Sequence, residues 1–288
     1  MMLRWLVSEM VRNASRKGLR SVVEQAAQQV STPGEVTESA EEPWHCEIAI
    51  VVGMGVEAGG VIDLLKDART TRCAHYVEHA GFLGGRRVVV AVSGTGAEAA
   101  NQTTEDLIAL YRPGWVVAAG FAAALQNDIQ RGHFVMPQSV VDQAGRVLAV
   151  GFQLDSESST QMNGLHCGQL LSIDELINSI EEKRRLAEQH GAVACDMETA
   201  AVAACCQRCQ TRFLSVRIIT DGFDERLPES MVTLNRQKSL SGKLGAAAGA
   251  IWNRPGTVKD LWKLKQDALQ ASDRLGRFLT GVIAQLSN

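Results

Sequence analysis

The sequence has little that would suit a nucleic acid, a membrane or a metal ion. Its 29 basic and 32 acidic residues leave a formal net charge of −3, whereas nucleic-acid-binding domains usually concentrate basic side chains on one face. No run of 18 or more uncharged apolar residues is present to span a bilayer. Cys206 and Cys209 form a Cys-x-x-Cys pair, but no second pair or His-x-x-x-His follows at zinc-site spacing. We therefore expect no nucleic-acid partner and no bound metal.

The cysteines and the start of the chain bear on the cellular compartment. The seven cysteines are odd in number, and Arg4, Glu9 and Arg12 interrupt the apolar start, unlike the core of a secretory signal. Reduced thiols in the cytoplasm are therefore the prediction. We interpret Cys206 and Cys209 as small side chains that pack a helix.

What remains is the composition of a globular protein, with 45% hydrophobic and 21% charged residues among 288. Residues 1–30 repeat apolar side chains at helical spacing, and residues 31–44 are polar, acidic and interrupted by two prolines. We expect an amphipathic helix and acidic linker over 1–44, followed by one domain over 45–288. The helix could contact a partner or a membrane surface, or it could be a poorly ordered extension.

Buried strands and helices alternate along the domain. Continuous apolar runs predict strands at 48–52, 87–92, 115–119 and 213–219, with shorter candidates at 133–136 and 147–150. Helical patterns occupy 57–66, 97–111, 173–190 and 198–210, and a final pair spans 231–250 and 257–286. This alternation indicates an α/β sheet covered by helices on both sides.

Glycine-rich turns follow three of the predicted strands. Residues 53–58 have the form G-x-G-x-x-A, residues 94–99 repeat it, and Gly120 follows the third strand. The first turn, with Glu78 about 25 residues further on, is compatible with an NAD(P)-dependent dehydrogenase. Three turns in series also place open backbone N–H groups at one sheet edge, where small polar or anionic groups can bind.

Two acidic residues in the second half of the sequence are candidate catalytic residues. Glu198 opens an alanine-rich helix, and Asp221 follows an apolar strand. Each could be only a helix-start or turn residue. If both face one crevice, one carboxylate can stay ionised and hold hydroxyls while the other, desolvated, donates a proton. Cleavage of a nucleoside needs such a pair, because its ribosyl transition state is cationic and its purine leaves more readily when protonated.

Several segments together resemble the nucleoside phosphorylase superfamily. They are residues 93–96, Gly120, 172–177, 183–186, 191–201 and 216–221. Within the superfamily the chain is most similar to methylthioadenosine/S-adenosylhomocysteine nucleosidases and to hopanoid-associated phosphorylase-like proteins, over about residues 47–225. The resemblance implies a single three-layer domain with a central mixed sheet flanked by helices. It also implies a homo-oligomer that needs no cofactor and cleaves the N-glycosidic bond of a 5′-substituted adenosine, by hydrolysis or with phosphate as co-substrate.

The resemblance also assigns roles on the base and ribose sides. Asp221 would protonate the leaving purine, while Leu176 and Ile177 would pack on the base. Met197 and Glu198 would hold the ribose.

On the acceptor side, Ser93, Gly94 and Gly96 would line the place of the water or phosphate, near Gly120. Glu57 is the acidic residue after the first strand that could activate water. A catalytically inactive nucleoside-binding module remains the other alternative to a dehydrogenase.

Overall fold

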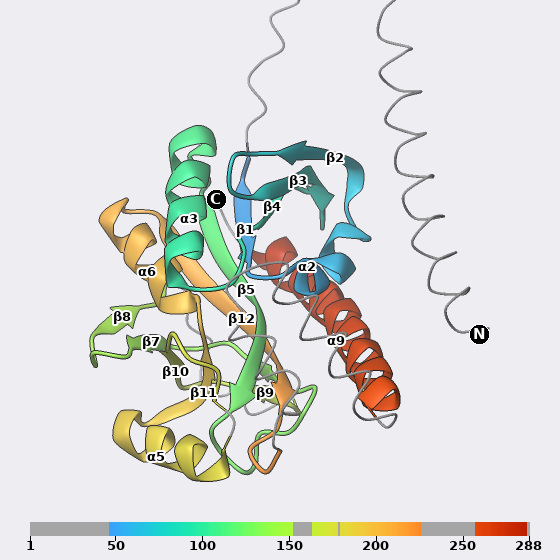
Figure 1. Ribbon diagram of the computed structural model, residues 1–288. Coiled ribbons are helices and arrows are strands. Elements are labelled where there is room, and N and C mark those ends of the chain that lie inside the picture. Colours follow the sequence, from blue (N-terminus) through green and yellow to red (C-terminus); the bar gives the residue numbers. More distant parts are fainter. Residues whose placement is uncertain (1–45, 152–162, 178, 226–256, 287–288) are drawn as a thin grey trace, which may run out of the picture. The chain divides into compact units, whose positions relative to one another are not determined.

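The computed structural model describes residues 46–151, 163–177, 179–225 and 257–286 (Figure 1). The outer and central strands of the first half are β1 (Ile48–Val52), β2 (Lys66–Arg72), β3 (Val77–Leu83), β4 (Arg86–Val92) and β5 (Trp115–Ala124). The later strands are β6 (Phe134–Val135), β7 (Ser139–Asp142), β8 (Val147–Ala149), β9 (Leu165–His166), β10 (Gln169–Ser172), β11 (Ala192–Asp196) and β12 (Arg212–Asp221). The helices are α2 (Gly55–Ile62), α3 (Ala97–Tyr111), α5 (Ile180–His190), α6 (Thr199–Arg208) and α9 (Thr257–Gln285).

The described strands form one mixed sheet. At its centre β4, β1, β5 and β12 run parallel, while β2 and β3 extend one side as antiparallel strands. The strand β1 and residues 88–92 of β4 are apolar because both of their faces are covered. The mixed, helix-flanked α/β fold predicted from the sequence is thereby confirmed.

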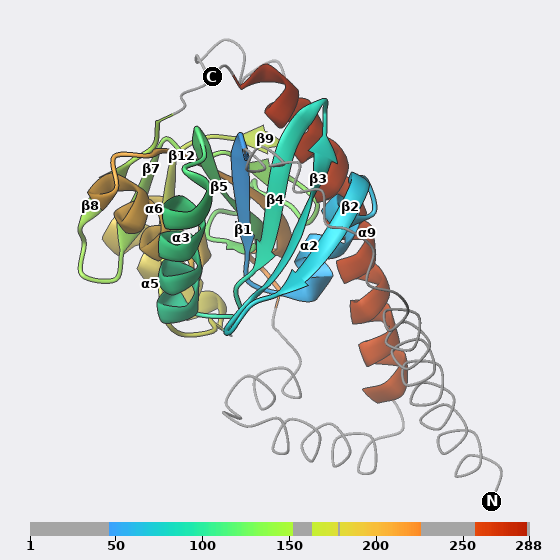
Figure 2. The ribbon, with the colours of Figure 1, turned by 90° about the horizontal axis from the view of Figure 1, so that it is seen from above.

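Helices cover both faces of the sheet (Figures 1 and 2). The pair α2 and α9 packs on one face and the pair α3 and α6 on the other. The first pair approaches closely through glycine: a Cβ on Gly60 would lie 2.2 Å from the Ser272 carbonyl oxygen, and one on Gly276 would lie 2.3 Å from that of Gly60. The amide of Gly60 donates to Ser272 Oγ at 2.8 Å. None of the described helices is long and apolar enough to cross a membrane.

The strands that pair with β5 determine where the candidate site lies. One edge of β5 is occupied over most of its length by β12. The other edge is shared: β1 pairs in parallel with its first half at Trp115–Ala118, and β11 pairs antiparallel with Ala123 and Ala124. Because β1 and β11 run in opposite directions along one edge, their carboxyl ends point toward each other. The residues that follow them therefore converge beside the middle of β5.

Some predicted boundaries were wrong. The helix expected at 57–66 is α2, and Lys66 already begins strand β2, whose seven residues are exposed and carry no hydrophobic pattern. The helix expected at 173–190 begins only at Ile180, where Ser179 Oγ caps the amide of Glu182. Before it lies β10, a strand that the sequence analysis did not predict.

Two further predictions concern residues that the structure does not describe. The expected helix and acidic linker over 1–44 and the expected helix over 231–250 lie outside the described residues.

Candidate active site

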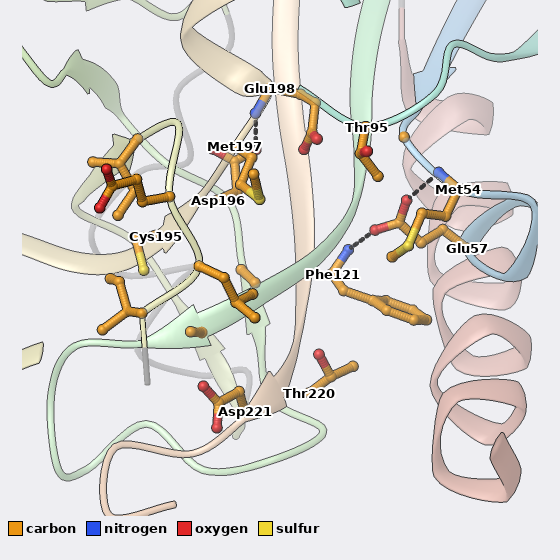
Figure 3. Close-up of a pocket in the computed structure, with 17 residues that line it drawn as sticks. Met54, Glu57, Thr95, Phe121, Cys195, Asp196, Met197, Glu198, Thr220 and Asp221 are labelled. Carbon is orange, nitrogen blue, oxygen red and sulfur yellow. Dashed lines mark hydrogen bonds between the residues drawn. The ribbon is translucent and has the colours of Figure 1, made fainter. Parts of the chain in front are cut away.

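A pocket of about 250 Å³ opens where β1 and β11 end beside β5. Figure 3 shows that acidic side chains lie at both ends of it, Glu57 and Glu198 at one and Asp221 at the other. Its lining comes from six parts of the chain: Gly53, Met54, Glu57, Thr95, Phe121–Ala123, Ile173, Glu175–Ile177, Cys195–Glu198, Thr220 and Asp221. Five acidic residues are thus part of the lining, and three of them, Glu57, Glu198 and Asp221, come from separate strand ends around a small, largely apolar space.

Glu57 is held at the first turn of α2. Its side chain is 4% exposed. Both carboxylate oxygens accept backbone hydrogen bonds at 2.7 Å, one from the amide of Met54 and the other from that of Phe121 (Figure 3). Burial raises the pKa of Glu57, and the nearby Arg217 guanidinium opposes that rise. The result is a fixed carboxylate that is a stronger base than an exposed glutamate.

Glu198 lies across from Glu57 at the start of α6. A Cβ on Gly53 would lie 3.4 Å from an oxygen of each carboxylate, so the glycine leaves room for both side chains to approach its backbone. Glu198 Oε1 accepts from the Gly96 amide at 2.8 Å. Burial, with a further contribution from Asp196, raises the pKa of Glu198 to about 7. Its charge therefore changes near neutral pH.

A buried ion pair supports this acidic end from behind. Arg217 Nη2 lies 2.7 Å from Asp196 Oδ2, and both side chains are almost completely buried. Thr199 Oγ1 accepts from the same guanidinium nitrogen at 2.7 Å and donates to Asp196. Ser172 Oγ donates to the other oxygen of Asp196. Such a network is costly to break because removal of one partner leaves a buried charge unpaired.

The other end of the pocket holds Asp221, the last residue of β12. Lys183 Nζ from α5 lies 2.9 Å from its Oδ2. Neither Oδ1 nor Oδ2 has a hydrogen-bond partner among the described residues, so the contact with Lys183 is an ion pair. Burial raises the pKa of Asp221, and Lys183 acts against that rise. A raised pKa suits a carboxyl group that donates a proton.

The remaining predicted site residues divide into two groups. Met197, Leu176 and Ile177 line the pocket with the three carboxylates. Four others lie beside it without lining it, namely Ser93, Gly94, Gly96 and Gly120.

The four residues that do not line the pocket shape its acidic end. Ser93 is buried, and its Oγ donates to the carbonyl oxygens of Val52 and Gly94. Gly94 and Gly96 have φ of 88° and 102°, which side chains rarely adopt. At Gly120 a Cβ would lie 2.4 Å from the Arg217 guanidinium and 2.7 Å from Glu57, so only glycine fits there.

The features that suggested a dinucleotide site have other roles. The amide of Met54, in the first glycine turn, donates to the protein's own Glu57. Glu78 lies on the antiparallel strand β3, where its Oε1 accepts from Tyr111 Oη at 2.8 Å, and it does not line the pocket. Glu78 therefore does not take the role of the ribose-binding acid that a dinucleotide fingerprint requires.

The family model of the phosphorylase superfamily matches residues 47–248. The chain belongs to this superfamily. Curated relatives include a 5′-methylthioadenosine/S-adenosylhomocysteine nucleosidase of Shewanella piezotolerans, 24% identical over 62% of this chain and 87% of the relative. The nucleosidase of the same name from Staphylococcus epidermidis is 25% identical over 67% of this chain and 97% of the relative.

Solved structures of superfamily members share the fold. The 5′-methylthioadenosine/S-adenosylhomocysteine nucleosidase of Helicobacter pylori superimposes with a TM-score of 0.64 at 19% identity, covering 84% of this chain and 99% of that one. A futalosine hydrolase from the same organism gives a TM-score of 0.64, also at 19% identity, over 84% of this chain and 98% of that one.

Sequence reasoning missed several residues of the site. Arg217 gave a usable signal, since a charged residue inside the apolar run 213–219 has to be paired if the strand is buried. Lys183 lies in the stretch 183–186 that resembles the superfamily, but its place at the site was not predicted, because a lysine in a charged helical stretch is usually exposed. Phe121 lies on β5, and Thr95 lies between β4 and α3. They line the pocket because the fold brings these two segments together.

Proposed function

We propose that this protein hydrolyses the N-glycosidic bond of a 5′-substituted purine nucleoside and releases the free base. One observation carries the proposal: Glu57, Glu198 and Asp221 line a single pocket from three strand ends, with different surroundings for each. The fold and the family are those of known nucleosidases.

Asp221 is the proposed proton donor for the leaving base. Its raised pKa keeps a proton available, and the unpartnered Oδ1 offers a position for a purine ring nitrogen. When the bond between C1′ and the base breaks, the electron pair moves into the purine, and protonation of the ring lowers the cost of that step. A positioned general acid contributes about 10²–10⁴-fold to such a reaction.

Glu198 and Glu57 are the proposed partners of the ribose and of water. Ionised Glu198, beside Met197, would accept hydrogen bonds from the ribose hydroxyls and stabilise the positive charge that develops on the sugar. Glu57, fixed by the amides of Met54 and Phe121, would take a proton from a water molecule that attacks C1′.

Several features favour water over phosphate as the acceptor. Neither arginine nor lysine occurs among the described residues that line the pocket, and the guanidinium of Arg217 is already paired with Asp196. The amide of Gly96, a natural donor to an anion at a helix start, already donates to Glu198. A phosphate dianion there would meet Glu57 and Glu198 with little compensating positive charge.

The substrate class follows from the relatives. Their names specify 5′-methylthioadenosine and S-adenosylhomocysteine, and one structural neighbour acts on futalosine. The chain is therefore to be tested first with these nucleosides and with adenosine and inosine.

The experiment is to incubate the purified full chain with this panel, with and without phosphate, and to measure the free base and the sugar product by chromatography. We expect free base and the reducing sugar at rates that phosphate does not change. A sugar 1-phosphate formed only with phosphate would assign phosphorolysis. Binding of a nucleoside without release of base would favour an inactive module, and hydride transfer with a nicotinamide cofactor would favour a dehydrogenase.

We also propose, from the family resemblance, that the chain forms a homo-oligomer in the cytoplasm and uses no cofactor. Light scattering after size-exclusion chromatography tests the assembly, and cell fractionation tests the location. Activity that survives exhaustive treatment with chelator and dialysis would support the absence of a cofactor.

A further inference from the structure

Lys183 is a buried charged group that the proposed chemistry leaves unused. It lies in the first turn of α5 and is 0% exposed, as is rarely seen for lysine. Placing an ammonium group in the interior is costly unless all of its donors are satisfied. Its contacts therefore indicate what the group does.

The ammonium group of Lys183 donates to two carbonyl oxygens and forms an ion pair with one carboxylate. Nζ lies 2.9 Å from Asp221 Oδ2, 2.6 Å from the carbonyl oxygen of Gly222 and 3.0 Å from that of Glu225. All three of these oxygen atoms lie at or just after the end of β12. The helix α5 thus reaches across to fix one carboxylate and the short segment that follows it.

The carboxylate of Asp221 separates the ammonium group from the pocket. Asp221 lines the pocket, whereas Lys183 does not. Lys183 forms an ion pair with the Oδ2 atom and not with the Oδ1 atom, and neither oxygen has a hydrogen-bond partner among the described residues. This arrangement leaves Oδ1, the oxygen that is not in the ion pair with Lys183, for a bound base.

We propose that Lys183 is a positioning residue that holds Asp221 with one oxygen toward the leaving base and stabilises the carboxylate that remains after proton transfer. The inference rests on the proposed function, because it assumes that Asp221 is the proton donor. The proton moves from Asp221 to a purine ring nitrogen as the C1′–base electron pair enters the ring. Lys183 keeps its three protons throughout and is neither acid nor base in the step.

The other ionisable groups around Asp221 do not replace this role. The pKa of Asp221 is also influenced by Glu225, which raises it, and by Arg131, which lowers it. These two groups form an ion pair with each other. The thiol of Cys195, on β11, has its own pKa raised by burial and is neutral near pH 7. Lys183 is thus the cation in direct contact with the carboxylate.

The first test is Lys183→Met, which keeps the volume of the stem and removes the charge. We expect kcat to fall about 10- to 100-fold, a part of the contribution of a general acid, with KM changed less than about threefold. Loss of the ammonium raises the pKa of Asp221, so the basic limb of the kcat/KM profile moves about one to three pH units higher. Arg184→Gln, an exposed change one residue along α5, is the matched control and should behave as the parent.

The second test is Lys183→Met combined with Asp221→Asn. If Lys183 acts through Asp221, the double variant should have the activity of Asp221→Asn alone within about threefold, because the residues act as a unit. The neutral pair also avoids an unpaired buried charge, so this comparison remains valid if Lys183→Met by itself does not fold.

Three results would overturn the inference. They are an unmoved basic limb in Lys183→Met, a rise in KM with unchanged kcat, and losses that multiply in the double variant. Failure of the proposed function looks different, since the parent chain would then release no base from any nucleoside of the panel.

Discussion

The two ends of the pocket use acidic side chains in opposite ways. At the end formed after β1 and β11, the carboxyl groups of Glu57, Asp196 and Glu198 surround one guanidinium, that of Arg217. At the end formed after β12, a single carboxylate, Asp221, contacts its own buried ammonium, Lys183. The first end therefore has three acidic groups around one buried cation, whereas at the second end one acidic group, Asp221, faces one buried cation.

This difference shows how one pocket can stabilise a cation and donate a proton. Excess carboxylate at the ribose end favours a positively charged sugar and disfavours an anionic acceptor. At the base end, burial keeps Asp221 protonated more readily than an exposed aspartate, and Lys183 limits that effect. The same residue type therefore takes different roles according to its neighbours.

The largest expected effect comes from breaking the base end. Asp221→Asn should lower kcat about 10³- to 10⁴-fold, toward the upper end of what a general acid contributes. The folded structure should persist, because asparagine can still accept from Lys183. Base release and the melting temperature are the two measurements. Nearly normal release of base would remove Asp221 from the role of proton donor.

Removing the proposed base Glu57 should lower the rate of hydrolysis less than Asp221→Asn does. Glu57→Gln keeps the shape of the side chain but removes the base, so hydrolysis should fall about 10²- to 10³-fold. Added phosphate should not restore turnover, and initial rates with and without phosphate provide the measurement. Recovery with phosphate would show that the pocket accepts an anion despite its charge.

Glu198→Gln tests the proposed contact between Glu198 and the ribose hydroxyls. A hydrogen bond to a charged group contributes about 1.5–3 kcal/mol, so kcat/KM should fall about 10- to 150-fold. A 2′-deoxy or 3′-deoxy nucleoside should lose less activity with this variant than with the parent. Equal losses on the intact and deoxy nucleosides would place the ribose contact elsewhere.

The smallest effect concerns pH. The pKa of Glu198 is raised to about 7, and only its ionised form can accept from hydroxyls and stabilise a cation. Activity should therefore fall as pH drops below about 7, by up to about tenfold per unit. The kcat/KM profile of the parent, compared with that of Glu198→Gln, measures this limb. A profile that is flat down to pH 5 would mean that Glu198 is not required in its ionised form.

Local sequence patterns predicted most of the sheet centre and its helices. The apolar runs at 48–52 and 115–119 and the helix at 97–111 are found where they were expected. The exposed strand β2 was missed because its pairing depends on backbone hydrogen bonds to β3 and not on buried side chains. The strand β10 was not predicted, because only two of its four residues, Leu170 and Leu171, are apolar, and so short a run does not distinguish a strand from other structure.

The sequence alone determined which residues could carry chemistry, since an acid at a strand or helix end is visible in the order of residues. Only the tertiary structure decided which of them meet. The convergence of Glu57 with Glu198 depends on β1 and β11 meeting head to head along one edge of β5, a pairing of opposite directions that no local pattern encodes. The contact between Lys183 and Asp221 joins residues 38 positions apart in sequence on different elements. It forms because a buried ammonium requires acceptors, and the folded end of β12 provides them.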